Sequence, residues 1–167
     1  DCIIFATGFE VGTDYSRRAG YQIHGSDGLT VSQKWGDGLS TFHGMHSRGF
    51  PNSFFFGPAQ SGFTATYTYS LDEQSIHLAY ILKKAKEQGA TRIEASEEAE
   101  EKWINTIVEK ARLTATFQEN CTPGYYNNEG KVNQTPQNNT YGGGPIEFFS
   151  LMKKWRTKDN LEGLELS

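Results

Sequence analysis

The first third of the chain consists of short apolar runs separated by glycines, a pattern typical of strands and turns. Residues 2–5 form a β-branched apolar run that stops at Ala6-Thr7-Gly8, which predicts a strand buried on both faces, as in a parallel α/β sheet. Similar β-prone runs, bounded by glycine or proline, predict further strands and hairpins at residues 21–23, 29–31, 41–43 and 53–56.

The rest of the chain contains stretches with the spacing of amphipathic helices. The first is expected over residues 69–88, because it stops at Gly89, a natural residue just past a helix end. The second starts at Ser96, which suits the N-cap, and the third at Pro145, which suits the first helical position. The residues expected on their inner faces are, in turn, Ile76, Ala79, Tyr80, Leu82 and Lys83; Trp103, Ile104, Ile107, Val108 and Ala111; and Ile146, Phe148, Phe149, Leu151, Met152 and Trp155.

A polar stretch from residue 118 to 144 separates the last two helices and is longer than connections in compact domains usually are. Its Asn, Gly and Thr residues bury little apolar area to offset the entropy of fixing the backbone, so we expect the least ordered part of the chain here. The aromatic rings of three tyrosines in this loop could pack on a cofactor or across the mouth of the pocket: Tyr125, Tyr126 and Tyr141. The loop is therefore expected to act as a lid that becomes ordered beside a bound cofactor.

Charge and cysteine content narrow the class of protein. The 16 basic and 20 acidic residues give a net charge of -4, which argues against a nucleic-acid or anionic-membrane partner. No apolar stretch approaches the roughly 20 residues of a membrane helix. Cys2 and Cys121 give no reason to expect a disulfide framework, which favours the cytoplasm. Because the chain opens directly on a predicted strand, we expect it to be a piece of a larger protein.

Several motifs, taken in order, carry the functional signal. Ala6-Thr7-Gly8-Phe9 follows the opening strand, and TFHGMHSRGFPNSFFFGP runs from residue 41 to 58. Gly62-Phe63-Thr64-Ala65 comes next, and CTPGYYNNEG from residue 121 and Tyr141-Gly142-Gly143-Gly144 lie further on. This ordered set, which spans nearly the whole chain, resembles the C-terminal part of Baeyer–Villiger flavin-containing monooxygenases.

The resemblance implies an α/β fold that is part of the two-dinucleotide-binding architecture of flavin monooxygenases, the end of the FAD-domain sheet followed by C-terminal helices. Residues 1–68 would be the C-terminal strands of the FAD/NADP-binding region. Residues 69–167 would be a helical lobe with a cofactor- and substrate-side loop at 118–144. The parent enzyme would use FAD and NADPH to insert one oxygen atom from O2 into a ketone substrate, giving an ester or lactone.

The chain itself lacks the glycine-rich nucleotide fingerprint, so it would need the missing N-terminal part of the parent and be inactive alone. The arginine that family members use in catalysis is also expected upstream. We therefore assign no catalytic residue here.

The resemblance also places individual residues beside the cofactors. Small residues at the end of a parallel strand let the backbone approach a nucleotide. The residues expected where the flavin and nicotinamide domains join are Ala6, Thr7, Gly8 and Phe9. Cys121 stands about where many family members place a residue that touches the nicotinamide cofactor.

A second group of candidate residues follows Gly57-Pro58, where many related flavoproteins have Gly-Asp. Thr66 and Tyr67 would lie against the pyrimidine edge of the flavin, at the start of a helix whose free N–H groups face an electron-rich acceptor. The expected substrate pocket consists of Phe63, Thr64, Ala65 and Tyr67.

Alternative interpretations remain open. His43, His46 and Arg48 lack the spacing of a zinc site, and we expect histidines that are solvent-exposed or bonded to the backbone. A flavin monooxygenase that oxidises N or S atoms shares part of the motifs. A non-catalytic binding module, whose aromatic-rich last helix docks a partner, is a third possibility.

Overall fold

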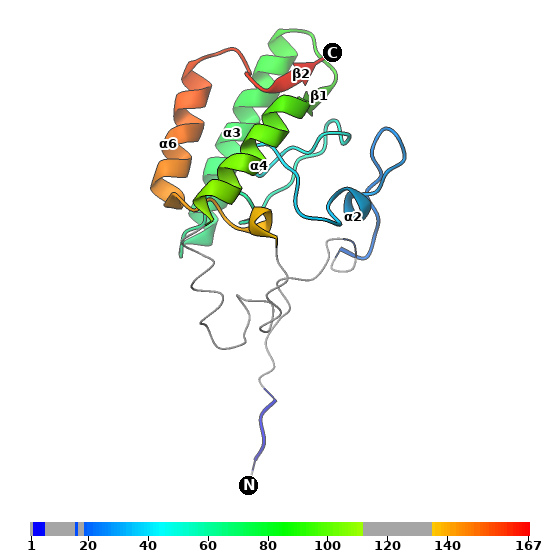
Figure 1. Ribbon diagram of the computed structural model, residues 1–167. Helices are drawn as coiled ribbons and strands as arrows, with labels where there is room; N and C mark the ends of the chain where they lie inside the picture. Colours follow the sequence, from blue (N-terminus) through cyan, green and yellow to red (C-terminus); the bar gives the residue numbers. More distant parts are fainter. Residues whose placement is uncertain (1, 6–15, 17–18, 112–134) are drawn as a thin grey trace.

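The computed structural model describes residues 2–5, 16, 19–111 and 135–167. Three long helices lie side by side and form its body: α3 (Tyr67–Glu87), α4 (Glu97–Lys110) and α6 (Gly144–Thr157) (Figure 1). Their facing sides enclose the main apolar core, to which Phe42 and Tyr141 also contribute from the connecting segments.

The position of α3 agrees with the prediction, but its buried face does not. The helix ends at Glu87 and is followed by Gly89 in the left-handed conformation (φ 72°). Ile76 and Leu82, both expected inside, are each 45% exposed. The residues that α3 buries are Ser70, Gln74, His77, Ile81 and Ala85. The buried face of α3 therefore carries polar side chains. Its members keep helical spacing, but contacts with neighbouring segments, and not the positions of the apolar residues, decide which face is covered.

Helix α4 follows the prediction closely. The side chain of Ser96 accepts a hydrogen bond from the amide of Ala99 (3.2 Å), and acidic residues fill the first turn, where they complement the helix dipole. Trp103 and Ile107 are buried, whereas Val108 is 39% exposed.

Helix α6 buries the aromatic face that the sequence predicts. Pro145 lies in its first turn, and the buried residues are Phe148, Phe149, Met152 and Trp155. Ile146, expected on the same face, is 83% exposed. Because the aromatic residues fill the core, they do not form the docking surface on which the binding-module alternative depends.

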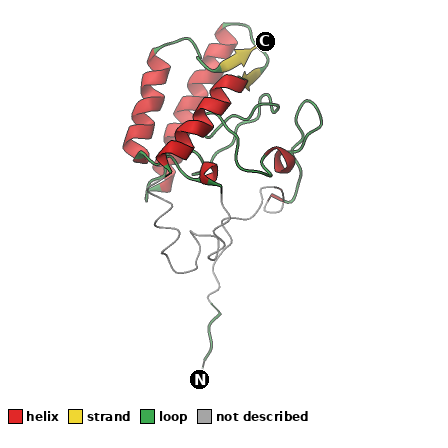
Figure 2. Ribbon diagram, viewed as in Figure 1, coloured by secondary structure: helices red, strands yellow, loops and turns green. Residues whose placement is uncertain are grey.

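Within the described residues, strands pair only at one end of the helices (Figure 2). The strands β1 (Ile93–Ala95) and β2 (Leu164–Leu166) are antiparallel, with Ile93 opposite Leu166. Neither was predicted, because two three-residue strands far apart in the sequence leave no local pattern.

The strands expected in the first third of the chain are not found among the described residues. Residues 2–5 form no strand, and Ile3, Ile4 and Phe5 are between 79% and 85% exposed, since no described strand lies beside them to complete a ladder. Residues 21–23, 41–43 and 53–56 likewise lack ladders; Phe42 makes only an isolated bridge, with His46.

The strand expected at residues 29–31 is instead the beginning of a helix. Thr30 caps α2 (Val31–Lys34) through a capping box in which Thr30 and Gln33 satisfy each other's backbone amides. Val31 then packs with Phe50 and Phe55 in a second, smaller apolar cluster.

The described end of the predicted lid is anchored to the core. It contains the short 3-10 helix η2 (Pro136–Asn138), and Asn138 Oδ1 accepts a hydrogen bond from the amide of Leu39 (2.7 Å). Tyr141 is only 3% exposed, so it is a core residue and offers no free face to a cofactor. Residues 118–134, with Tyr125 and Tyr126, lie outside the described residues. None of the helices described is long and apolar enough to cross a membrane.

Candidate functional site

A rigid turn at residues 57–62, which we call the platform, lies a few residues before the start of α3. Ser61 Oγ (2.5 Å) and Gln74 Nε2 (3.0 Å) both donate hydrogen bonds to the carbonyl of Gly57. The amide of Tyr141 donates to the carbonyl of Ser61 (3.0 Å). These bonds fix the backbone of the platform and, with it, the start of the segment that follows at residue 63.

Close contacts also seat the platform on the core. Trp103 Nε1 of α4 donates to the carbonyl of Gln60 (3.1 Å). A Cβ atom at Gly62 would come within 2.7 Å of the Phe148 ring of α6, so only glycine fits at this position without movement of the core. The platform is therefore held against both helices.

The exposed strip, residues 63–67, continues from the platform into the first residue of α3. Phe63 is 40% and Tyr67 is 38% exposed, and their ring centroids are 6.0 Å apart. Thr64 Oγ1 donates to the carbonyl of Thr66 (2.6 Å), and Thr66 is the N-cap but makes no side-chain cap hydrogen bond. The amide of Tyr69 donates to the carbonyl of Thr66 (3.0 Å), whereas the amides of Tyr67 and Thr68 precede the backbone ladder of α3 and lie at the positive end of its dipole.

The strip brings together all the residues predicted for the flavin edge and the substrate pocket: Phe63, Thr64, Ala65, Thr66 and Tyr67. Ala65 is exposed and small, and Thr64 is half-buried with its hydroxyl already engaged by the backbone. The arrangement offers aromatic faces and backbone donors, but no carboxylate or imidazole. It is suited to hold and orient a planar, electron-rich group rather than to transfer protons.

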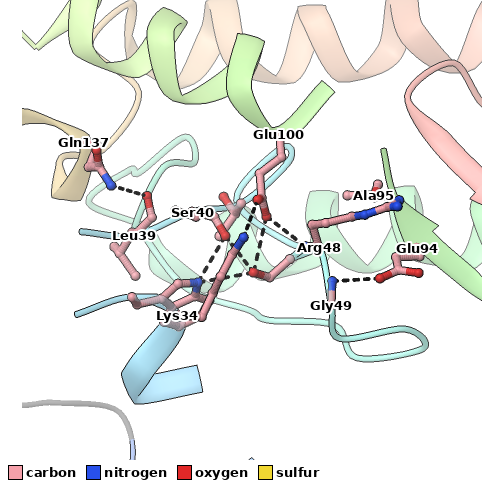
Figure 3. A network of polar contacts seen from close by, with 12 residues as sticks. Lys34, Leu39, Ser40, Arg48, Gly49, Glu94, Ala95, Glu100 and Gln137 are labelled. Carbon is pink, nitrogen blue, oxygen red and sulfur yellow. Dashed lines mark hydrogen bonds and ion pairs between the residues drawn. The ribbon is translucent and has the colours of Figure 1, made fainter. Parts of the chain in front are cut away.

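The 41–58 motif has a structural role in the segment around Arg48. Arg48 Nη1 donates to the carbonyl of Ala95 (3.0 Å) and pairs with Glu165 (2.5 Å). The buried carboxylate of Glu100 accepts from the Arg48 amide (2.7 Å) and pairs with Lys34 (2.8 Å) (Figure 3). This network fastens the motif to α4 and β1.

Glu94 of β1 closes the same network. It is buried, which raises its pKa, but hydrogen bonds from Arg92 (2.7 Å) and from the amide of Gly49 (2.7 Å) outweigh burial and hold that pKa below its ordinary value. A hollow of about 340 Å³ beside these residues is lined by Lys34, Arg48 and Arg92. Each of these cations pairs with a carboxylate, so the hollow does not present free positive charge to a phosphate.

The histidines of the motif are buried, contrary to the expectation that they would be exposed or bonded to the backbone. His43 is 3% and His46 is 2% exposed, and His43 lies 5.5 Å from the ring of His77 of α3. Burial lowers the pKa of His46 to about 4, and burial together with Arg156 lowers the pKa of His77 to about 3. Burial and the two neighbouring histidines lower the pKa of His43 as well. Among the described residues, no three ligating side chains are grouped so that they would hold a metal ion.

Five predicted cofactor contacts lie outside the described residues: Ala6, Thr7, Gly8, Phe9 and Cys121. Two central residues of the described part were missed by sequence reasoning. Gln60 is fully buried in the platform, and nothing in the sequence around it indicates this burial. Glu100 could have been identified, because it lies three residues before Trp103 and therefore on the same buried stripe of α4, where a carboxylate needs a partner.

No protein-family model matches this chain. Its curated relatives include neopentalenolactone D synthase of Streptomyces avermitilis, which is 46% identical over 169 residues. The Baeyer-Villiger monooxygenase ATR8 of Stachybotrys chlorohalonatus is 36% identical over 168 residues, and the FAD-binding monooxygenase hmp7 of Hypomyces subiculosus is 34% identical over 166. Each match covers 99% of this chain, but the chain spans only 27% or 28% of the length of these relatives.

Solved structures show the same fold. The polycyclic ketone monooxygenase from the thermophilic fungus Thermothelomyces thermophila matches 92% of this chain with a TM-score of 0.84 and 31% identity, over 25% of its own length. A cyclohexanone monooxygenase variant from Rhodococcus, solved with NADP+, matches 98% of this chain with a TM-score of 0.75. Its 22% identity supports the fold alone, and the match covers 28% of that chain.

Proposed function

In sequence and fold this chain belongs to the Baeyer–Villiger family of flavin-dependent monooxygenases, and we propose that it supplies one wall of the cofactor pocket in such an enzyme. The enzyme would use FAD and NADPH to insert one oxygen atom from O2 into a ketone, giving an ester or lactone. Because the chain spans little more than a quarter of its relatives, it would act together with the rest of the enzyme, including the N-terminal nucleotide-binding part.

The observation that carries this proposal is the exposed strip on its rigid platform. The flavin ring system is planar and its pyrimidine edge is electron-rich. The strip matches these properties with the aromatic faces of Phe63 and Tyr67. Its N-cap, Thr66, makes no side-chain cap hydrogen bond, which leaves the amides of Tyr67 and Thr68 to an external acceptor. The residues present therefore fit the flavin.

Each residue of the strip would have its own task. The amides at Thr66 and Tyr67 would hold the pyrimidine edge and favour negative charge there, because the dipole of α3 ends at this point. Phe63 and Tyr67 would exclude water from the pocket, and the small Ala65 would leave room for a ketone. When bound, FAD supplies the redox chemistry by accepting electrons from NADPH and activating O2.

The remaining contacts rest on the resemblance alone. We propose that Ala6, Thr7, Gly8 and Phe9 lie at the junction of the flavin and nicotinamide domains, and that Cys121 approaches the nicotinamide cofactor. The division at residue 68 into a strand region and a helical lobe stays a prediction. We place the enzyme in the cytoplasm, without a nucleic-acid or membrane partner, because the chain has a net charge of -4 and Cys2 is a free thiol.

The role of the α3 amides can be tested by comparing Tyr67→Pro with Tyr67→Ala in the full-length enzyme. Tyr67 is the first helical residue, a position where proline is tolerated, so Tyr67→Pro removes the amide without breaking α3. Tyr67→Ala removes only the ring and serves as the control. The wild type should purify with flavin absorbance, and Tyr67→Pro should raise the FAD dissociation constant about tenfold over Tyr67→Ala. Equal FAD dissociation constants for the two variants would show that the Tyr67 amide does not bind the flavin.

A further inference from the structure

Gln60 lies at the centre of the platform and is fully buried, with 0% of its surface exposed. Its backbone is in the left-handed conformation (φ 53°), which residues other than glycine rarely adopt. Such a conformation persists only where the surrounding structure over-determines it, and residues of this kind cluster at functional sites.

Every polar group of Gln60 has a partner. Its amide donates to the carbonyl of Asn139 (2.9 Å), and its carbonyl accepts from Trp103 Nε1 (3.1 Å). Its side-chain nitrogen donates to the carbonyls of Leu39 (2.7 Å) and Gln137 (2.8 Å). Its side-chain oxygen accepts from the hydroxyl of Thr41.

These partners belong to three stretches that are far apart in the sequence. Residues 39–41 lead into the buried histidine turn, residues 137–139 are the end of η2 and the residue after it, and Trp103 is in the middle of α4. Gln60 thus joins the loop before the motif, the segment before α6 and the core of the helical bundle at one point. Phe63, the first residue of the exposed strip, comes only three residues later.

We propose that Gln60 is a positioning residue of the flavin site, which sets the place and direction of the exposed strip. The inference rests on the proposed function of that strip. Gln60 does not touch the cofactor; it acts through residues 61–67, whose backbone it holds relative to α4 and η2. An apolar residue of similar volume would fill the same space, but it would leave the carbonyls of Leu39 and Gln137 with fewer donors.

The test is the substitution Gln60→Met in the full-length enzyme, which keeps the volume and removes the three side-chain hydrogen bonds. The matched control is Gln137→Met. Gln137 Nε2 also donates to the carbonyl of Leu39 (3.1 Å), but Gln137 does not precede the strip, and its own carbonyl remains available to Gln60 (Figure 3 shows the bond from Gln137 to Leu39). A second, milder variant, Thr41→Val, removes only the hydrogen bond to the side-chain oxygen of Gln60.

The primary readouts are the FAD dissociation constant and the visible circular dichroism of bound flavin, both measured where every variant is folded. Gln60→Met should weaken FAD about tenfold and change the flavin dichroism, and Thr41→Val should shift both in the same direction by less. Gln137→Met should change the FAD dissociation constant less than about threefold. Met152→Ala, a core substitution in α6 away from the platform, controls for loss of stability alone.

The outcomes separate this inference from the proposed function. If Gln60→Met binds FAD with wild-type affinity and an unchanged flavin dichroism, or if Met152→Ala weakens FAD equally, Gln60 has no positioning role. If the wild-type enzyme itself binds no FAD, the proposed function fails, and this inference fails with it.

Discussion

The three buried histidines predict a specific loss of stability in mild acid. His43, His46 and His77 pack among Phe42, Trp103 and Trp155. Among the described residues, Arg156 brings a charge to this cluster: its Nη1 lies 3.4 Å from His77 Nδ1, and its Nη2 pairs with Glu73 at 3.9 Å. A proton added to this cluster would therefore be buried beside a cation and an aromatic core.

The direction and the size of the stability loss in acid follow from the shifted histidine pKa values. Because burial lowers the histidine pKa values in the folded state, the unfolded chain binds more protons, and the folding free energy is lost as pH falls below about 6.5 towards the folded-state values. With folded-state pKa values of about 4 for His46 and about 3 for His77, each costs about 2 kcal/mol between pH 7 and pH 5. His43 acts in the same direction. The total is a large part of the roughly 5–15 kcal/mol that stabilises a typical domain.

The assay is equilibrium urea unfolding at pH 7, 6 and 5 for the wild-type chain, His46→Leu and His24→Leu. His24 is exposed and serves as the control. The loss of stability between pH 7 and 5 should shrink by about 2 kcal/mol in His46→Leu and stay unchanged in His24→Leu. If His46→Leu and the wild type lose the same stability over this range, His46 titrates normally and the reasoning is wrong.

Three further substitutions, one of them with a matched surface control, test the packing by chemical denaturation. Trp103→Ala should cost about 3–5 kcal/mol, because the indole is 5% exposed and a cavity would remain, whereas Ile146→Ala, at an 83% exposed position, should change stability by less than about 0.5 kcal/mol; a negligible shift for Trp103→Ala would contradict the burial. Glu100→Ala should cost about 3 kcal/mol by leaving buried donors unpaired, and an unchanged unfolding midpoint would mean that the network of Figure 3 contributes nothing. Gly62→Ala should lower the free energy of unfolding by about 1–3 kcal/mol, because the new Cβ would clash with the Phe148 ring. A stabilised variant would show that the ring can move aside without cost.

Local signals were enough to predict the helices. Ser96 as a cap, Pro145 in the first turn of α6 and Gly89 after α3 each determine the backbone through their own chemistry, and the structure confirms all three. The buried face of α3 was wrong, since Gln74 is held inside by a bond to Gly57, a contact between segments that are distant in the sequence.

Long-range pairing explains the other differences. β1 and β2 are too short to have a period of their own, and Ile93 finds its partner Leu166 only in the folded chain. The apolar run at residues 2–5 has the composition of a buried strand, but its state depends on neighbours that the described residues do not provide. In the candidate site, the motif located the exposed strip, whereas Gln60 acts through contacts with three distant segments and could not be read from the pattern.

The central claim is that this chain is part of an enzyme that transfers one oxygen atom from O2 to a ketone. The most direct measurement is mass spectrometry of the products formed by the purified full-length enzyme from isotopically labelled O2, NADPH and a panel of cyclic ketones, with an amine and a sulfide as competing substrates. The account predicts a lactone that carries one labelled oxygen atom and forms in step with NADPH consumption. Label found only on nitrogen or sulfur, or NADPH consumed without any oxygenated product, would contradict it.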